Sequence, residues 1–166
     1  MPNEATVAEL FEMAVTAEKA AEALYRGLEA KFAHYQEVAD FWGKYAAEEA
    51  GHARRLEHLR DRLSPGQLSA PADPRILKDA RKILQFSVEN TLRAIRNLED
   101  ACQLVHELES SETNAVFEFL ITHFSSDEET QSFLRSQLKD HIARLTVGFP
   151  TQFQSAMRRQ EAKALE

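Results

Sequence analysis

The stretch Phe41–Leu56 reads FWGKYAAEEAGHARRL, and its apolar residues recur at the spacing of one helix face. Two polar residues interrupt that face, Glu49 and His52, which stand three positions apart. This spacing places a carboxylate and an imidazole side by side on one helix. An unpaired carboxylate in a protein core is costly by several kcal/mol, so such an acid is usually paired or bound to a cation.

A similar helix face precedes this one and also carries a single acid. Glu18 lies between Val15 and Ala21, in a series of apolar residues that begins at Phe11 and continues to Tyr25. The pattern predicts two helices that break near residues 34–36. Two interpretations follow for the polar residues: Glu18 and His52 hydrogen-bond each other as a structural pair, or they hold a cation together.

Proline and glycine divide the chain into two helical blocks. Four of these residues gather in the segment 65–74, and no proline lies between Arg75 and Phe149. The pattern predicts one domain over residues 1–150, with a hairpin at about 4–64, a linker at 65–74 and a second hairpin at about 75–149. Residues 151–166 form a tail. The expected fold is an all-α four-helix bundle with one crossover connection.

The second block is expected to begin with a long helix. Asp73 before Pro74 is a favourable helix start, and apolar residues continue at helical spacing to about Glu109. After a break at 111–113, a short extra helix is expected at 115–124. Ser126 and Glu129 form a capping-box pattern that predicts a last helix. Overlaying this helix on residues 40–56 places His141 on His52, as in a diverged repeat.

Composition narrows the chemistry and the partners. The net charge of −7 disfavours nucleic acid as a partner, and no segment is apolar and long enough to predict a membrane span. The N-terminus lacks a signal-peptide pattern, so we expect a cytoplasmic protein. The single cysteine, Cys102, excludes a four-thiolate iron site. A metal would therefore be held by carboxylates and histidines.

Glu18, with Tyr25 seven residues later, and the Glu49-x-x-His52 motif resemble the first half of a rubrerythrin-type domain of the ferritin-like superfamily. The resemblance covers about the first 150 residues. It implies that each hairpin supplies one glutamate from its first helix and an E-x-x-H motif from its second. It also implies that the two sets hold a pair of iron ions in the core of a ferritin-like bundle.

The second hairpin departs from this pattern. Glu89 and Glu99 compete for the ligand position on the third helix, and we choose Glu99 because its neighbours at helical spacing are more apolar. His141 matches the family histidine of the fourth helix. Leu138 stands where the resemblance implies an acid, so the second motif is L-x-x-H.

The candidate ligands are therefore three carboxylates and two imidazoles, namely Glu18, Glu49, His52, Glu99 and His141. Oxygen and imidazole ligands of this kind suit iron first, with manganese or zinc as alternatives. With one acid fewer than the resemblance implies, the site is expected to hold one ion, or two with the second held weakly. His106 is expected beside the ligands as a hydrogen-bond donor.

Three functions remain open. The resemblance implies a di-iron oxidoreductase that reduces peroxide or activates oxygen, a role in oxidative stress. Because one cysteine cannot build the rubredoxin iron–sulfur domain of full-length rubrerythrins, such an enzyme needs an external electron donor. The alternatives are an iron-binding or iron-sensing module without turnover, and a structural or interaction bundle whose metal site has decayed. A homodimer is expected, as in related bundles.

Overall fold

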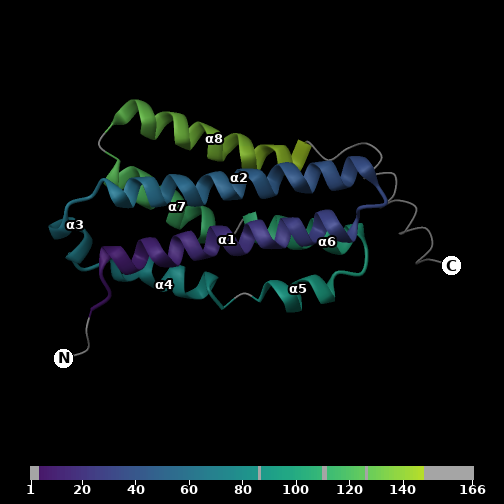
Figure 1. Ribbon diagram of the computed structural model, residues 1–166, viewed down its shortest axis with the longest axis horizontal. Helices are drawn as coiled ribbons and strands as arrows, with labels where there is room; N and C mark the ends of the chain where they lie inside the picture. The colour runs from purple at the N-terminus through teal and green to yellow at the C-terminus, as the bar shows by residue number, and fades with distance from the viewer. Residues whose placement is uncertain (1–3, 86, 110–111, 126, 148–166) are drawn as a thin grey trace.

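The computed structural model describes residues 4–85, 87–109, 112–125 and 127–147, and every regular element in these ranges is an α-helix (Figure 1). The predicted all-α, ferritin-like bundle is thereby confirmed at the level of fold class. None of the helices in these ranges has the length and apolar character required to cross a membrane. In chain order the helices are α1 (Val7–Lys31), α2 (Gln36–Asp61), α3 (Pro65–Ser69), α4 (Pro74–Ile83), α5 (Val88–Ala94), α6 (Leu98–Glu109), α7 (Glu112–Phe124) and α8 (Glu128–Val147).

The two long helices α1 and α2 form an antiparallel hairpin whose turn lies where the sequence predicted it (Figure 1). A reciprocal capping box begins α1. The Thr6 hydroxyl accepts from the backbone N–H of Glu9, and the Glu9 carboxylate accepts from that of Thr6 at 2.8 Å. The hairpin is the most extensively packed pair of helices, and it carries the polar residues singled out above.

The linker is partly ordered by its own helix and by the chain start. Ser64 caps the short helix α3, and the segment that follows pairs with the residues before α1. The backbone N–H of Val7 donates to Ala70 and that of Ala72 donates to Ala5, each at 2.9 Å. These bonds fix where the second helical block begins relative to the first.

The prediction of a single helix from Asp73 to about Glu109 is wrong, because that stretch forms three helices, α4, α5 and α6. Side-chain caps explain the interruptions. The Ser87 hydroxyl accepts from the N–H of Asn90 at the start of α5, and Asn97 Oδ1 accepts from the N–H of Asp100 at the start of α6. Apolar spacing continues across both breaks, which is why the pattern looked like one helix.

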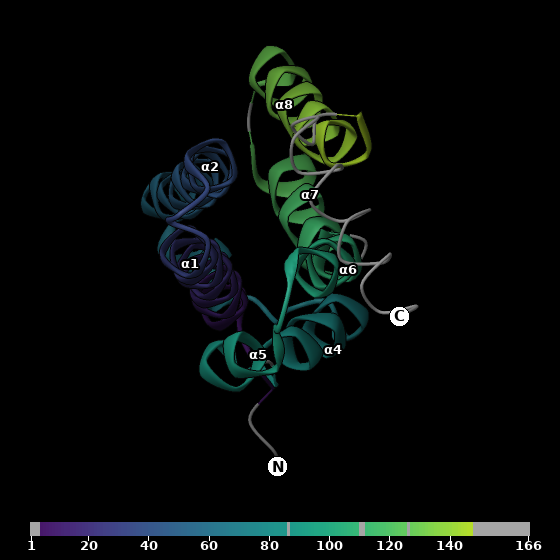
Figure 2. The same cartoon turned by 90° about the vertical axis from the view of Figure 1, so that its right-hand side faces the viewer.

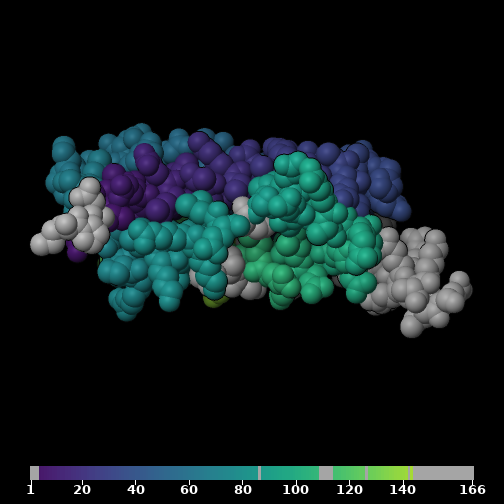
Figure 3. Space-filling view, turned by 90° about the horizontal axis from the view of Figure 1, so that it is seen from below, coloured from purple at the N-terminus to yellow at the C-terminus, as the bar shows by residue number. Residues whose placement is uncertain are grey.

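The path of the chain after these breaks changes which helices fill the bundle. Helices α4 and α5 run along α1, and α6 and α7 return in the opposite direction (Figures 1 and 2). The short helix predicted at 115–124 is present as α7, and Phe117, Leu120 and Ile121 on it are buried in the core. Helix α8 lies beyond α7, on the side of α2 (Figure 2). The space-filling view in Figure 3 shows that α4 and α5 cover one side of α1.

The start of α8 differs in its capping residue. Ser126, which the capping-box prediction invoked, lies outside the described residues. Asp127 carries a cap instead, since its carboxylate accepts from the N–H of Glu129 at 3.0 Å and from the Thr130 hydroxyl at 2.7 Å.

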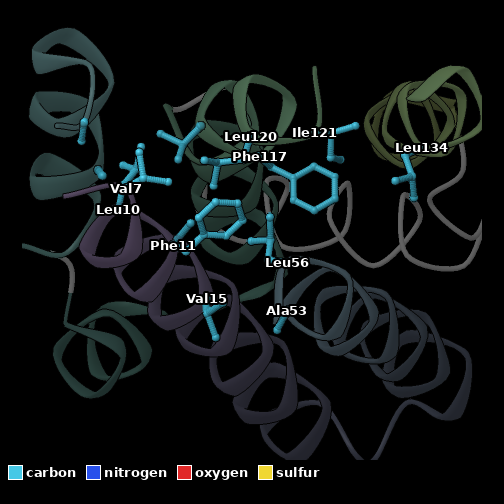
Figure 4. Packing of buried hydrophobic residues seen from close by; sticks show 14 of the residues in the cluster. Val7, Leu10, Phe11, Val15, Ala53, Leu56, Phe117, Leu120, Ile121 and Leu134 are labelled. Carbon is cyan, nitrogen blue, oxygen red and sulfur yellow. The ribbon is translucent and has the colours of Figure 1, made fainter. Parts of the chain in front are cut away.

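Among the residues that the structure describes, two apolar clusters make up the core, one toward each end of the α1–α2 hairpin. The first joins the start of α1 and the end of α2 to α7 and α8 (Figure 4). The second joins the other ends of α1 and α2 to α6. On α1, Glu18 lies between Val15 of the first cluster and Ala21 of the second. The buried acids therefore lie where the two clusters meet.

Candidate metal centre

Helices α1 and α2 bring Glu18, Glu49 and His52 together in the interior. One ligand atom from each residue can be chosen so that all lie within 4.8 Å of one another. His52 Nδ1 lies 3.7 Å from Glu18 Oε2 and 3.5 Å from Glu49 Oε2. The side chains of Glu18 and Glu49 are 2% and 4% exposed, and that of His52 is 12% exposed. The grouping of these three residues agrees with the sequence prediction.

Local sequence explains the convergence. Glu49 and His52 are three residues apart on α2, so they share a face, and Glu18 projects from the antiparallel helix opposite. The neighbours that flank the acids on these faces, Ala21 and Ala46, are small and buried. They leave the polar side chains as the groups that fill the space between the two helices.

The two carboxyl groups have opposite pKa shifts. Burial raises the pKa of Glu18 well above its usual value, and the negative charge of Glu49 raises it further. Burial also acts on Glu49, but hydrogen bonds with Glu18 and His141 and the charge of His52 outweigh it and hold its pKa below the usual value. Glu49 is therefore the acid that ionises more readily, and Glu18 is the acid that holds its proton more strongly.

His52 has a nitrogen directed at these carboxylates without a hydrogen bond. Its Nδ1 is buried and has no hydrogen-bond partner, since both carboxylate oxygens lie beyond hydrogen-bonding distance. Burial lowers the pKa of His52, but Glu18 and Glu49 more than offset this effect, and the net pKa rises to about 9. The ring packs on Phe117 of α7 at a centroid distance of 4.7 Å.

Helix α8 brings His141 to the same place, where both of its ring nitrogens contact carboxylates. His141 Nε2 lies 2.9 Å from Glu49 Oε1, and Nδ1 contacts Glu48 Oε2. The Tyr45 hydroxyl donates to the backbone carbonyl of His141 at 2.9 Å, which holds α8 against α2. In this arrangement His141 orients Glu49. Its role as a metal ligand remains a prediction.

Glu48 is a participant that the sequence reasoning missed. It follows the apolar face of α2 at an angle of about 100° from Glu49, so helical periodicity places it toward solvent. Its side chain is 29% exposed. Only the position of α8 reveals that Glu48 faces His141, and no local pattern in the sequence signals that contact.

The structure does not bring the predicted third-helix ligand into this group. Glu99 is exposed on α6, outside the group of Glu18, Glu49 and His52, and His106 on the same helix is also exposed. Glu89, the competing acid, is exposed and pairs with Arg93 within α5. Leu138 is buried in the first apolar cluster.

The chemistry of the assembled residues fits a metal ion. Two carboxylates and an imidazole are ligands that iron, manganese and zinc accept. The His52 Nδ1 atom, which has no hydrogen-bond partner, faces the two carboxylates and could coordinate an ion between them. Buried acids that share this space repel each other unless a proton or a cation lies between them. Within the described ranges this is the one group of at least three acidic, histidine or cysteine side chains with such spacing.

Comparison with known families agrees with the site. A family model described as rubrerythrin matches residues 9–140, which contain Glu18, Glu49 and His52; His141 lies one position beyond the match. No curated protein and no solved structure matches the chain.

Proposed function

The chain belongs to the rubrerythrin family, and from this premise we propose that it binds an iron ion between α1 and α2 through Glu18, Glu49 and His52. The observation that carries the proposal is the buried, unpartnered Nδ1 of His52, which faces two carboxylates. Bound iron would supply the electron-transfer chemistry with peroxide or oxygen that the family resemblance implies.

The surrounding residues support a role for His141 as the partner that orients Glu49. An imidazole that donates to a ligating carboxylate fixes the orientation of that carboxylate and tunes its basicity. Glu48 holds the other nitrogen of the same ring. Phe117 covers one side of the His52 ring. These contacts restrict the ligands to a narrow range of positions before a metal ion arrives.

The same residues favour one tightly held ion over a metal pair. Among the described residues, no second group of three candidate ligands lies opposite the first. Leu138 is packed among apolar side chains, and Glu99 is exposed. We therefore propose that the protein binds iron with little turnover of peroxide, so that the iron-binding module is favoured over the two-metal oxidoreductase. Manganese and zinc are the competing ions.

Metal analysis of the purified protein after iron loading tests this proposal. We expect about one ion per chain, and a rise in unfolding free energy of about 2.7 kcal/mol when free metal is a hundredfold above its dissociation constant. Glu49→Gln keeps the shape of the side chain and removes a ligand charge, so it should abolish most of the binding. Glu18→Gln should do the same.

Glu99→Gln is the matched control, because it removes one acid from an exposed position on α6. It should bind metal as the wild type does. Equal losses for Glu49→Gln and Glu99→Gln would show that the ligand set is wrong, and the absence of metal from the wild type would exclude the site. Peroxide consumption with an added chemical reductant then separates the two functions: rapid turnover would favour the oxidoreductase.

A further inference from the structure

A cavity of about 310 Å³ lies at the end of the bundle where the last turns of α2 meet α3, the α7–α8 connection and the first turns of α8. It is separate from the three candidate ligands, none of which lines it. Its walls are of two kinds. Basic side chains from α2 line one part, and apolar side chains from α2, α7 and α8 line the other.

The basic part consists of Arg55, His58 and Arg62, which recur on one face of α2 at helical spacing. Within the described ranges, neither arginine takes part in an ion pair. Both guanidinium groups are therefore available to an anion from solvent. They stand out in a chain whose net charge is −7.

Asp127 is the acid in the cavity wall, and its carboxylate is already engaged at the start of α8. Hydrogen bonds from the Thr130 hydroxyl and the backbone of Glu129 lower its pKa, so it remains charged. Among the described lining residues, two arginines against one aspartate leave the wall with a net positive charge. An anionic group is therefore expected on the arginine side of the cavity, away from Asp127.

The apolar part is formed by Leu59, Ile121, Phe124 and Leu134, which belong to the first apolar cluster or pack against it. Figure 4 shows Ile121 of α7 and Leu134 of α8 at the edge of that cluster. A ligand that places carbon atoms here removes apolar surface from water on both sides. The volume is at the lower end of the range for small-molecule sites.

We propose that this cavity binds a small organic carboxylate with an apolar body, of the size of a medium-chain fatty acid. The carboxylate accepts hydrogen bonds from Arg55 and Arg62, whose planar guanidinium groups match its two oxygens. The hydrocarbon part lies against the side chains of α7 and α8. The inference does not depend on the proposed metal function, because the cavity and the ligand group share no residue.

Calorimetric titration of the metal-free protein with octanoate, octanol and inorganic phosphate tests the proposal. Octanoate should bind saturably, and octanol and phosphate should each bind more weakly because each lacks one half of the recognised chemistry. The double variant Arg55→Gln and Arg62→Gln should weaken octanoate binding about tenfold or more. The control double variant Arg54→Gln and Arg93→Gln makes the same change in net charge outside the cavity and should bind octanoate as the wild type does.

Each opposite result is informative. Phosphate that binds as tightly as octanoate would show a simple anion site, and octanol that binds as tightly would show an apolar site without charge recognition. Equal losses in the two double variants would place the binding elsewhere on the surface. A wild type that takes up no octanoate would overturn the proposal. Circular dichroism and thermal unfolding of each variant establish that the fold is retained.

Discussion

At the scale of single residues, the chemistry of this protein depends on a few polar groups that the core encloses. Glu18 and Glu49 are both buried, yet their pKa values move in opposite directions, because burial and the charge of Glu49 dominate at Glu18 whereas hydrogen bonds outweigh burial at Glu49. His52 faces both carboxylates. The three side chains satisfy one another only in part, and this incomplete pairing distinguishes the group from an ordinary structural ion pair.

A substitution at Leu138 tests how the second hairpin is packed. It is 5% exposed and lies in the apolar cluster with Leu134 and Phe117. Leu138→Glu places an acid there, and in the metal-free protein we expect the unfolding free energy to fall by about 3 kcal/mol or more. Gln137→Glu, at the exposed neighbouring position, should change it by less than about 0.5 kcal/mol.

Denaturant unfolding monitored by circular dichroism measures both variants. If Leu138→Glu is as stable as the wild type, its side chain has reached solvent or a partner, and the described packing of α8 is wrong. The family resemblance implies an acid at position 138, and it therefore predicts that the same substitution raises the metal content. Metal content measured on the same samples shows whether that gain occurs.

Cys102 provides a prediction that depends on pH. Burial raises the pKa of its thiol to about 12, and the nearby charge of Glu99 adds to the shift. The native thiol therefore stays protonated at pH 8, whereas the unfolded chain begins to ionise near its ordinary pKa. Alkylation of native protein by iodoacetamide at pH 8 should be slower than that of unfolded protein by on the order of a hundredfold.

The sign of the stability effect follows from the same shift. Below the unfolded pKa both states hold the proton, and stability is independent of this group. As pH rises from that value toward about 12, the unfolded state alone releases the proton, and this contribution lowers the stability of the fold. Similar alkylation rates in native and unfolded protein would contradict the assigned burial of Cys102.

At the scale of helices, packing between α1 and α5 depends on a glycine. A Cβ atom placed on Gly27 would lie 2.3 Å from Leu92 Cδ1. On Gly51 the nearest such atom is Arg54 Nη2 at 3.9 Å, an ordinary contact distance. The Lys31 ammonium group also donates to the Leu92 carbonyl at 2.7 Å, so α5 is held at this position.

The two glycines therefore form a matched pair. Gly27→Ala should lower the unfolding free energy by about 1 kcal/mol, because the steric cost exceeds the gain in helix propensity. Gly51→Ala should raise it by about 0.5–1 kcal/mol, because the alanine removes backbone freedom from the unfolded chain without meeting an obstacle. Thermal and denaturant unfolding of the metal-free variants measures both. A gain for both would mean that α5 moves away from α1 at little cost.

At the scale of the whole molecule, α8 is joined to the hairpin by contacts between residues far apart in the chain. The hydrogen bond from the Tyr45 hydroxyl to the His141 carbonyl spans 96 positions and is buried. Next to it, the imidazole of His141 contacts Glu48 and Glu49. These contacts connect the position of α8 to the geometry of the candidate metal centre.

Tyr45→Phe removes that hydrogen bond while keeping the ring. We expect a loss of about 1 kcal/mol in unfolding free energy, with faster amide hydrogen exchange in α8 than in α1. Tyr35→Phe is the control, since Tyr35 is 47% exposed, and it should change neither quantity. Unchanged exchange in α8 for Tyr45→Phe would show that other contacts hold this helix.

The sequence by itself determined the helical class, the turn of the first hairpin, the linker and the grouping of Glu18, Glu49 and His52. Each of these features is local or follows from residues that repeat every three or four positions on a face, so periodicity and capping patterns expose them. Periodicity does not predict the breaks before α5 and α6, because the apolar spacing continues across them. The side chains that cap these helices are nevertheless present in the sequence.

Only the tertiary structure decided how the remaining helices surround that group. The packing of the core places α7 inside the bundle and α8 beyond it. In this arrangement Glu99 is exposed and Leu138 is buried, and Glu48 contacts His141. Helical spacing states which side chains share a face, but the partner of that face depends on the direction of each connection and on the volumes packed between distant helices. The contacts of His141 belong to this second kind of information.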